Sequence, residues 1–209
     1  MVELIDNAVQ FFITLLSGVG AGILLYQKRI QAYFLLTCFF GSFALGTLYW
    51  TLNVLLYNHT PRVFYVSELS WLASFMFLLT LEYTLSTADE RAFRHPAGWI
   101  VPVFCVPQLL LYISRGDLLI NLLMCGMTMA AAWYSVLGLI YARRQSGKPR
   151  DKQHFHIAVL CIVFLEYCLW TASCFWISDT LTNPYFWLDM LMTASLYALL
   201  PATRKAVET

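Results

Sequence analysis

The chain has 209 residues, of which 60% are hydrophobic, 16% aromatic and only 12% charged. Soluble globular domains carry about 25% charged residues, so a chain of this length with a mean hydropathy of +0.66 cannot hide its apolar surface from water. This composition excludes a soluble enzyme, a disordered linker and a coiled coil, and a net charge of +1 gives no field that would attract nucleic acid. We expect an all-α integral membrane protein in contact with the lipid bilayer.

Seven apolar segments follow one another along the chain, and most are near the roughly 20 residues that a membrane-spanning helix needs. They cover residues 8–26, 32–57, 63–85, 99–113, 118–141, 155–177 and 184–200. The fourth is the shortest and the least regular, because it contains Pro102 and Pro107. None shows the alternating hydrophobicity of barrel strands. The sequence therefore predicts one domain, residues 1–209, with seven transmembrane helices.

A small-residue step lies on the first segment, where Gly18 and Gly22 are four residues apart. Such a step lets another helix approach closely. Packing against a helix of the same chain is the default expectation, and a homodimer seam is the alternative.

The positions of Lys and Arg indicate the orientation of the helices. Every Lys and Arg except Arg62 and Arg115 falls in the connections on one side of the bundle or after the last segment. Cytoplasmic connections carry an excess of basic residues, so this side is predicted to be cytoplasmic. The N-terminus then lies outside and the C-terminus in the cytoplasm, which an odd number of spans requires. We expect a multi-pass protein of the cell membrane.

Four acids fall within the predicted spans, where an ionisable group costs about 2.5–3.5 kcal/mol on insertion scales. Glu68 and Glu82 lie near opposite ends of the third segment, Glu166 near the middle of the sixth, and Asp189 in the outer part of the seventh. Glu68 and Asp189 are near enough to the outer surface to snorkel, and Glu82 is expected to reach cytoplasmic water. Glu166 has no such route, so it is either a proton-exchanging group or a protonated carboxyl that ties two helices together.

Aromatic and polar side chains recur at about the same depth in the outer half of four segments. Helical spacing sets each of three acids beside an aromatic residue on one helix face, and the second segment adds a tryptophan and an asparagine. Aromatic walls with a few convergent polar groups are typical of small-molecule pockets, whereas the alternative is ordinary packing in an aromatic belt. The candidate substrate- or proton-binding residues are Trp50, Asn53, Glu68, Trp71, Glu166, Trp170, Tyr185 and Asp189.

The third and seventh segments align with each other, which suggests an internal repeat. In this alignment Glu68 meets Asp189, and one segment earlier the step 50–51 meets the step 170–171, each a tryptophan followed by a threonine. The pattern is then three helices, a short linking helix between the halves, and three more helices in the same orientation.

This layout, with the N-terminus outside, resembles that of the SWEET sugar transporters and their PQ-loop relatives, and Pro107-Gln108 resembles the dipeptide of that family. The resemblance implies a small-molecule transporter. In the family the dipeptide stands on the first and fifth helices, whereas here it stands on the fourth, so no functional residue is carried over. A retinal protein is excluded because the last segment contains no lysine.

Sequence motifs for enzymatic chemistry are scarce. No zinc, phosphate or nucleophile motif occurs, so no catalytic residue, metal or cofactor is predicted. The leading hypothesis is a transporter or permease with an outward-facing aromatic and acidic cavity. One alternative is a seven-helix sensor or receptor that binds a small ligand and signals through a partner at the basic loop 143–152. Another is a membrane-embedded enzyme that uses the buried carboxylates.

Overall fold

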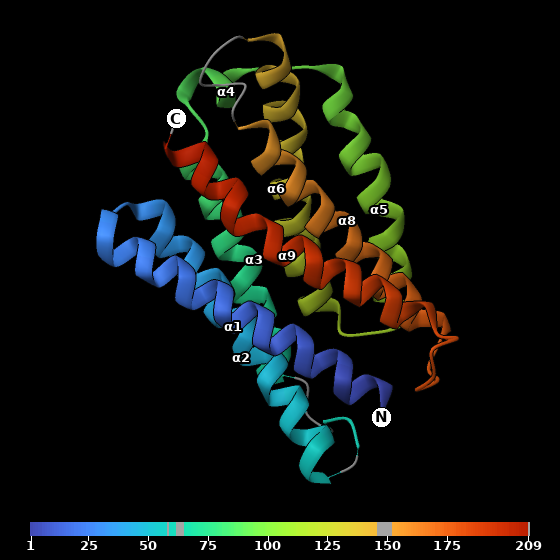
Figure 1. Cartoon of the computed structure of the whole chain (residues 1–209). Helices are drawn as coiled ribbons and strands as arrows, with labels where there is room; N and C mark the ends of the chain where they lie inside the picture. Colours follow the sequence, from blue (N-terminus) through green and yellow to red (C-terminus); the bar gives the residue numbers. More distant parts are fainter. Residues whose placement is uncertain (58, 62–64, 146–151, 209) are drawn as a thin grey trace.

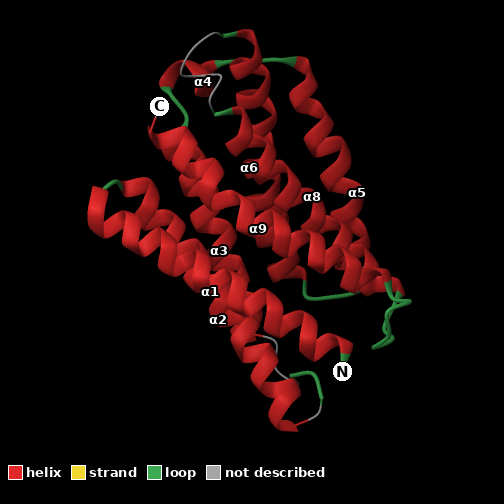
Figure 2. Ribbon diagram, in the orientation of Figure 1, coloured by secondary structure: helices red, strands yellow, loops and turns green. Residues whose placement is uncertain are grey.

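The computed structural model describes residues 1–57, 59–61, 65–145 and 152–208, and within these ranges it is helical with no strand (Figures 1 and 2). The elements in chain order are α1 (Val2–Lys28), α2 (Gln31–Tyr57), α3 (Tyr65–Leu85), α4 (Ala88–Ala92), η1 (Pro96–Trp99), α5 (Ile100–Ile113), α6 (Leu118–Arg144), α8 (Gln153–Phe175) and α9 (Pro184–Glu208). The short 3-10 helix η1 continues directly into α5.

Five of the described helices are long and apolar enough to cross a membrane. They are α1, α2, α6, α8 and the continuous segment Pro96–Ile113 that joins η1 to α5. The other two predicted spans became α3 and α9, whose acidic and hydroxyl side chains lower their mean hydropathy. The chain is therefore an all-α membrane protein.

The surface of α1 has the polarity that a lipid-facing helix needs. In a soluble protein the apolar face of a helix turns inward. Here Phe12 and Leu16 are 58% and 68% exposed, while the buried positions of the helix are mostly polar. Those buried positions are Asp6, Gln10, Thr14, Ser17 and Ala21. Such an arrangement places hydrocarbon against the outside of α1 and polar groups inside the bundle.

The long helices form two groups of three that meet along two contacts. In the first group α2 packs between α1 and α3, and in the second α8 packs between α6 and α9. The groups meet where α1 packs on α9 and where α3 packs on α6 (Figure 1). The α5 helix packs on α6 and α8, at the outside of the second group, rather than between the two groups as the linking-helix prediction had it. Its Gln108 accepts a hydrogen bond from Thr171 of α8 over 3.0 Å, which helps to hold it there.

Several helices run past the boundaries predicted from hydropathy. The first helix begins at Val2 rather than at residue 8, and the last continues to Glu208 rather than ending at residue 200. Apolar length underestimates these helices because their ends are polar, as the ion pair between Lys28 and Glu208 illustrates. The sequence analysis gave no helix at Ala88–Ala92, where α4 forms. Residues 62–64 and 146–151, with Arg62, Lys148 and Arg150, lie outside the described residues.

Gly18 and Gly22 lie against α2. A Cβ at Gly18 would lie 3.2 Å from the Cβ of Phe40, and one at Gly22 would lie 3.9 Å from Cγ2 of Thr37. The small-residue face of α1 is therefore covered by a helix of the same chain, as the default expectation had it. A homodimer seam on these two glycines would have to displace α2.

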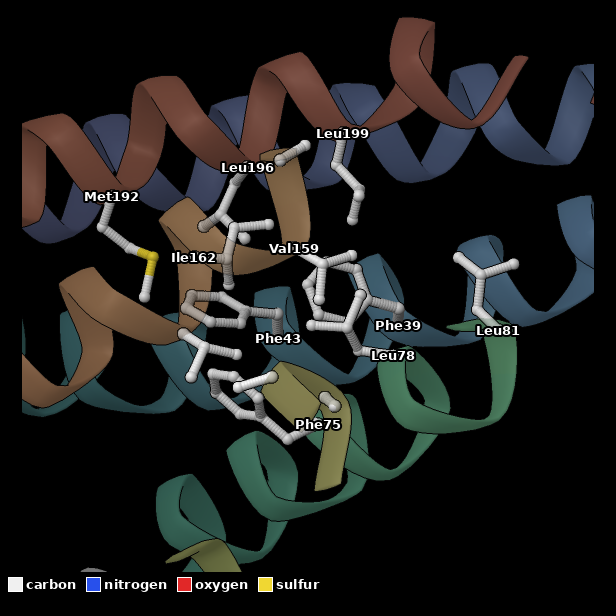
Figure 3. Packing of buried hydrophobic residues seen from close by; sticks show 14 of the residues in the cluster. Phe39, Phe43, Phe75, Leu78, Leu81, Val159, Ile162, Met192, Leu196 and Leu199 are labelled. Carbon is white, nitrogen blue, oxygen red and sulfur yellow. The ribbon is translucent and has the colours of Figure 1, made fainter. Parts of the chain in front are cut away.

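The centre of the bundle is a hydrophobic core between the two groups of helices (Figure 3). Phenylalanines from α2 and α3 meet aliphatic side chains from α8 and α9, and all are buried. The residues at the centre include Phe39, Phe43, Phe75, Leu78, Val159, Ile162, Met192, Leu196 and Leu199. This core separates polar side chains at one end of the bundle from those at the other.

Candidate functional site

Buried ionisable side chains gather at both ends of the bundle. We call the end that carries Met1 the N-terminal end, and the opposite end the C-terminal end (Figure 1). At the N-terminal end lies the carboxyl cluster, which consists of Asp6, Gln10 and Asp189. At the C-terminal end lies the ionic network, which consists of Glu82, Glu90, Lys152 and His156.

The carboxyl cluster lies where α1 packs on α9. Asp6 is 1% exposed, and Gln10 and Asp189 are each 4% exposed. The amide nitrogen of Gln10 donates a hydrogen bond to Asp189, and the amide oxygen of Gln10 accepts one from the hydroxyl of Thr47 over 3.3 Å. Because its oxygen faces Thr47, the amide presents its donor group to Asp189.

The carboxyl groups of Asp6 and Asp189 face each other within hydrogen-bonding reach. Neither oxygen of Asp6 has a donor among the described residues. Within the described chain, the side chains that act on the pair are acids and an amide, not cations. Two ionised carboxylates side by side in a low-dielectric interior repel each other strongly. One shared proton turns their contact into a hydrogen bond and leaves a single negative charge, which Gln10 stabilises. The geometry is that of a proton-binding acid pair.

Tyr185 and Glu166, two of the predicted site residues, lie close to this pair. Tyr185 is one turn before Asp189 on α9 and lies within electrostatic reach of Asp6, Asp189, Glu166 and Glu3. The carboxyl groups of these four residues therefore act on its phenol electrostatically. Of the candidate residues, Asp189, Tyr185 and Glu166 therefore lie within electrostatic reach of one another.

Glu166 and Trp170 of α8 line a small cavity. The ring of Trp170 stands edge-on to that of Tyr112, with centroids 5.1 Å apart. The cavity beside them has a volume of about 10 Å³ and is also lined by Tyr167 and Thr128. This is about the space that one water molecule needs, so an organic substrate does not fit beside Glu166 in this conformation.

Trp50 and Trp71 form an aromatic pair at the N-terminal end. Their ring centroids are 6.0 Å apart at an interplanar angle of 34°. The indole nitrogen of Trp50 donates to Oε1 of Glu3 over 2.8 Å. Trp71 packs closely against Gly46, where a Cβ would lie 2.9 Å from the indole nitrogen. The pair therefore links α2 to α3 and, through Glu3, to the start of α1.

Glu68 and Asn53 are not part of the carboxyl cluster. Glu68 of α3 is half-buried and lies within electrostatic reach of Asp117, the residue that caps α6. Asn53 donates to the backbone oxygen of Tyr49, one turn earlier on its own helix, over 2.9 Å. Neither residue has a described contact with another of the predicted site residues.

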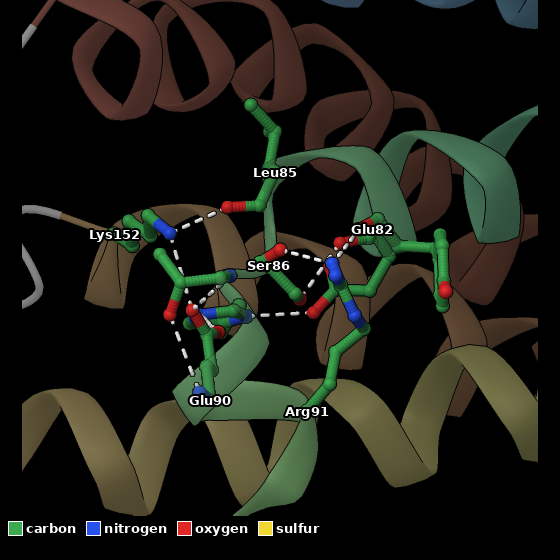
Figure 4. Close-up of polar contacts among 9 residues, drawn as sticks. Glu82, Leu85, Ser86, Glu90, Arg91 and Lys152 are labelled. Atoms are coloured by element: carbon green, nitrogen blue, oxygen red, sulfur yellow. Dashed lines mark hydrogen bonds and ion pairs between the residues drawn. The ribbon is translucent and has the colours of Figure 1, made fainter.

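The ionic network joins the first group of helices to the second. His156 of α8 is 1% exposed, and its two ring nitrogens face two different carboxyl groups. Nδ1 lies 2.8 Å from Oε1 of Glu82, and Nε2 lies 3.0 Å from Oε1 of Glu90. Lys152 lies 3.1 Å from the other oxygen of Glu90 and donates to the backbone oxygen of Leu85 (Figure 4).

The ionic network balances its own charge. An imidazole with a carboxylate at each nitrogen is best satisfied when both nitrogens carry protons, which makes His156 a cation. Two carboxylates then face one imidazolium and one ammonium group. Burial alone would raise the pKa of Glu90, but the hydrogen bonds and charges of His156 and Lys152 outweigh burial and leave that pKa below its ordinary value.

The local structure around Glu90 explains how the network is assembled. Thr87 and Glu90 form a capping box that starts α4: the backbone nitrogen of Glu90 donates to the Thr87 hydroxyl over 3.2 Å. Arg91 donates to the backbone oxygens of Ser86 and Tyr83, which holds α4 against the end of α3 (Figure 4). On α6, Gly138 leaves room for the network, since a Cβ there would lie 2.5 Å from Cε1 of His156 and 2.7 Å from Oε1 of Glu90.

The sequence analysis missed most of these residues. Asp6 falls before the first predicted segment, 8–26, and His156 falls near the start of the sixth, 155–177, but neither was among the candidate site residues. Glu82 was expected to reach water but is fully buried. Two patterns could have indicated the sites: polar residues at helical spacing along α1 from Asp6 to Ser17, and the T-x-x-E capping-box motif 87–90.

No group of His, Cys, Asp and Glu residues in the described chain is arranged to hold a metal ion. The described contacts of the two sites are hydrogen bonds and ion pairs. No family model, curated protein or solved structure matches the chain. The resemblance to SWEET transporters thus rests only on the order of the helices and on Pro107-Gln108.

Proposed function

We propose that the protein is a small-molecule membrane transporter that exchanges a proton at the carboxyl cluster. The observation that carries this proposal is the buried pair of Asp6 and Asp189, which meet without a cation in the described chain. Ionisable groups are costly inside a membrane protein and commonly mark proton or ion pathways. A pair that shares one proton can lose it when water enters and regain it when the site closes.

The position of the cluster between the two groups of helices supports this proposal. Two parallel three-helix repeats related by an axis along the membrane normal would pair α1 with α9 and α3 with α6, and these are the pairs in contact. The carboxyl cluster bridges the first contact at the N-terminal end. The ionic network lies beside the second contact at the C-terminal end. Rocking of one group against the other would open one end of the bundle while the opposite end stays closed.

The proposed orientation places the carboxyl cluster on the outer side. Basic residues end α1, α6 and α9 at the C-terminal end of the bundle, including Lys28, Arg144 and Lys205. Such residues favour the cytoplasmic side. In the proposed cycle, opening of the outer side exposes Tyr185, Glu166 and Trp170 to substrate, and the acids and indole rings suit a cationic or protonated molecule.

Sealed liposomes that contain the purified protein and a pH-sensitive dye test the proposal. Pools of sugars, amino acids and organic cations are added outside, with and without a pH gradient. We expect one pool to drive proton movement in the original protein, and we expect Asp6→Asn and Asp189→Asn to fold but lose this coupling. Asp179→Asn, an exposed acid at the same end, is the matched control and should couple normally.

Two results would contradict the transporter proposal. One is coupled flux that both Asn variants retain, since the carboxyl cluster would then play no part. The other is a solute that raises the unfolding temperature but is never moved across the membrane, a result that would favour the sensor or receptor alternative.

A further inference from the structure

A groove lies on the surface of the C-terminal half of the bundle, between α8 and α9. Its volume is about 400 Å³, within the range of roughly 300–1,000 Å³ that is typical of ligand sites. The groove is distinct from both the carboxyl cluster and the ionic network. Its lining residues are His154, Ile157, Ala158, Cys161, Ser195, Ala198, Pro201, Ala202 and Lys205.

The shape of the groove follows from small side chains on both helices. Ala158 and Cys161 of α8 face Ser195, Ala198 and Ala202 of α9 across it. These short side chains leave an apolar channel where larger ones would close the gap between the helices. Cys161 and Ala198 are exposed, so the channel opens toward the surroundings of the bundle rather than into its core.

The length of the groove matches one leaflet of a bilayer. Ser195 and Lys205 are ten residues apart on α9, which is roughly 15 Å along a helix axis at a rise of 1.5 Å per residue. The hydrocarbon core of a bilayer is about 30 Å thick. An apolar groove of this length can therefore hold one acyl chain from the membrane surface to the mid-plane.

The end of the groove at the membrane surface is basic. The ammonium group of Lys205 lies 3.4 Å from Nδ1 of His154, to which it can donate. An ammonium group and an imidazole, both of which can donate hydrogen bonds, therefore lie together at this end of the groove. A phosphate group accepts such donors, and basic pockets between helices on the cytoplasmic side bind anionic lipid headgroups.

We propose that this groove binds an anionic phospholipid of the cytoplasmic leaflet, with its phosphate at Lys205 and His154 and one acyl chain along Ala198 and Ala158. This lipid site rests on the orientation proposed above and is independent of transport. The lipid would fill the space between α8 and α9 and so stabilise their contact.

Native mass spectrometry of the full chain in detergent, with added phosphatidylglycerol or phosphatidylcholine, tests this proposal. We expect tighter binding of phosphatidylglycerol, and we expect Lys205→Gln to weaken it about fivefold, the effect of removing one basic side chain from an anionic lipid site. Ala198→Leu should abolish the tight binding by filling the groove. Ile157→Trp is a second groove-filling variant at an exposed position.

Two matched controls separate the groove from its surroundings. Arg143→Gln removes an exposed charge at the same end, and Ala194→Leu adds bulk at an exposed position of α9 one turn before Ala198. Both should bind phosphatidylglycerol as the original protein does. Unfolding temperatures in lipid-free detergent should agree among all the variants, which shows that they fold.

Other results would overturn the proposal. Equal binding of the two lipids, or unchanged binding by Lys205→Gln and both groove-filling variants, would show that the groove is not an anionic-lipid site. Stabilisation by inorganic phosphate equal to that by the lipid would indicate a site for the free anion. A dimer that Ala198→Leu or Ile157→Trp disrupts would show that a second copy of the chain occupies the groove.

Discussion

At the N-terminal end of the bundle, the acids Asp6 and Asp189 meet beside the amide of Gln10. At the C-terminal end, the imidazole of His156 lies between Glu82 and Glu90, and an ammonium group also contacts Glu90. Both pairs of acids are buried, and both lie where one group of helices meets the other. The difference is the counter-charge. Acids with cations can stay ionised when buried, whereas acids without cations must share or bind protons.

This difference suggests different roles for the two ends. The ionic network is a structural contact that holds α4 and α8 together, and removing one member leaves the others charged and buried. The carboxyl cluster adapts to the loss of one charge, because a neutral side chain that donates a hydrogen bond can replace a protonated acid. Variants of the two ends should therefore differ in stability before any substrate is known.

The largest expected effect is that of His156→Leu. Removing the imidazolium leaves Glu82 and Glu90 buried close together with one cation fewer, and breaking a buried ion pair in this way costs about 3–5 kcal/mol. Thermal unfolding in detergent measures the loss. His154→Leu, on the same helix but exposed, is the control and should change little. Equal stability of the two variants would show that the network does not hold the bundle together.

A smaller effect is expected of Gly138→Ala. The added Cβ would lie 2.5 Å from the His156 ring, so α6 or the imidazole must move, and overpacking of this kind costs about 1–3 kcal/mol. Gly126→Ala on the same helix meets no atom within 4 Å and should be neutral or stabilising, because alanine favours helix by up to about 1 kcal/mol over glycine. Effects of the same sign for both variants would contradict the close approach at Gly138.

Hydropathy and charge pattern predicted the fold class and most helix positions, because apolar length is a local property of the sequence. The start of α1 was predicted six residues late, since Asp6 has a polar side chain and lowers the local hydropathy. What hydropathy cannot show is that Asp6 turns inward to meet Asp189 across 183 residues of chain. That contact depends on α1 packing against α9, which only the tertiary structure reveals.

The contact of Glu82 with His156 is likewise a tertiary feature. Glu82 lies near the end of the third predicted segment, where water is normally within reach, so it was expected to reach cytoplasmic water. Glu82 is buried against His156 of α8, whose other ring nitrogen faces Glu90 of α4, a five-residue helix. Helices this short carry no hydropathy signal, and only the motif 87–90 indicates that one begins there.

The pH dependence of stability tests whether the ionic network is stabilised by the charge of Glu90. The pKa of Glu90 in the folded protein lies below its ordinary value of 4.5. A lowered folded-state pKa gives stability that is present above the ordinary value and is lost as the pH falls through the lowered value. We therefore expect Glu90→Gln to be less stable than the original protein at pH 7. The difference in unfolding temperature should shrink as the pH is lowered below about 4.5. A difference that stays constant over this range would show that the charge of Glu90 is not what stabilises the network.

The smallest expected effect is that of Asp6→Asn, and it tests the proposed shared proton most directly. If Asp6 and Asp189 share one proton, asparagine at position 6 supplies the same hydrogen bond from its amide, and the free energy of unfolding should change by less than about 1 kcal/mol. Asp6→Leu has a similar size but no donor, so the Asp189 carboxyl loses a partner, which costs about 1–3 kcal/mol. Infrared spectra should show a protonated carboxyl band in the original protein that Asp6→Asn reduces and Asp89→Asn, on the exposed side of α4, leaves unchanged. A loss of stability in Asp6→Asn as large as in Asp6→Leu would mean that an amide cannot replace the Asp6 side chain, and Asp6 would then not be the protonated member of the pair.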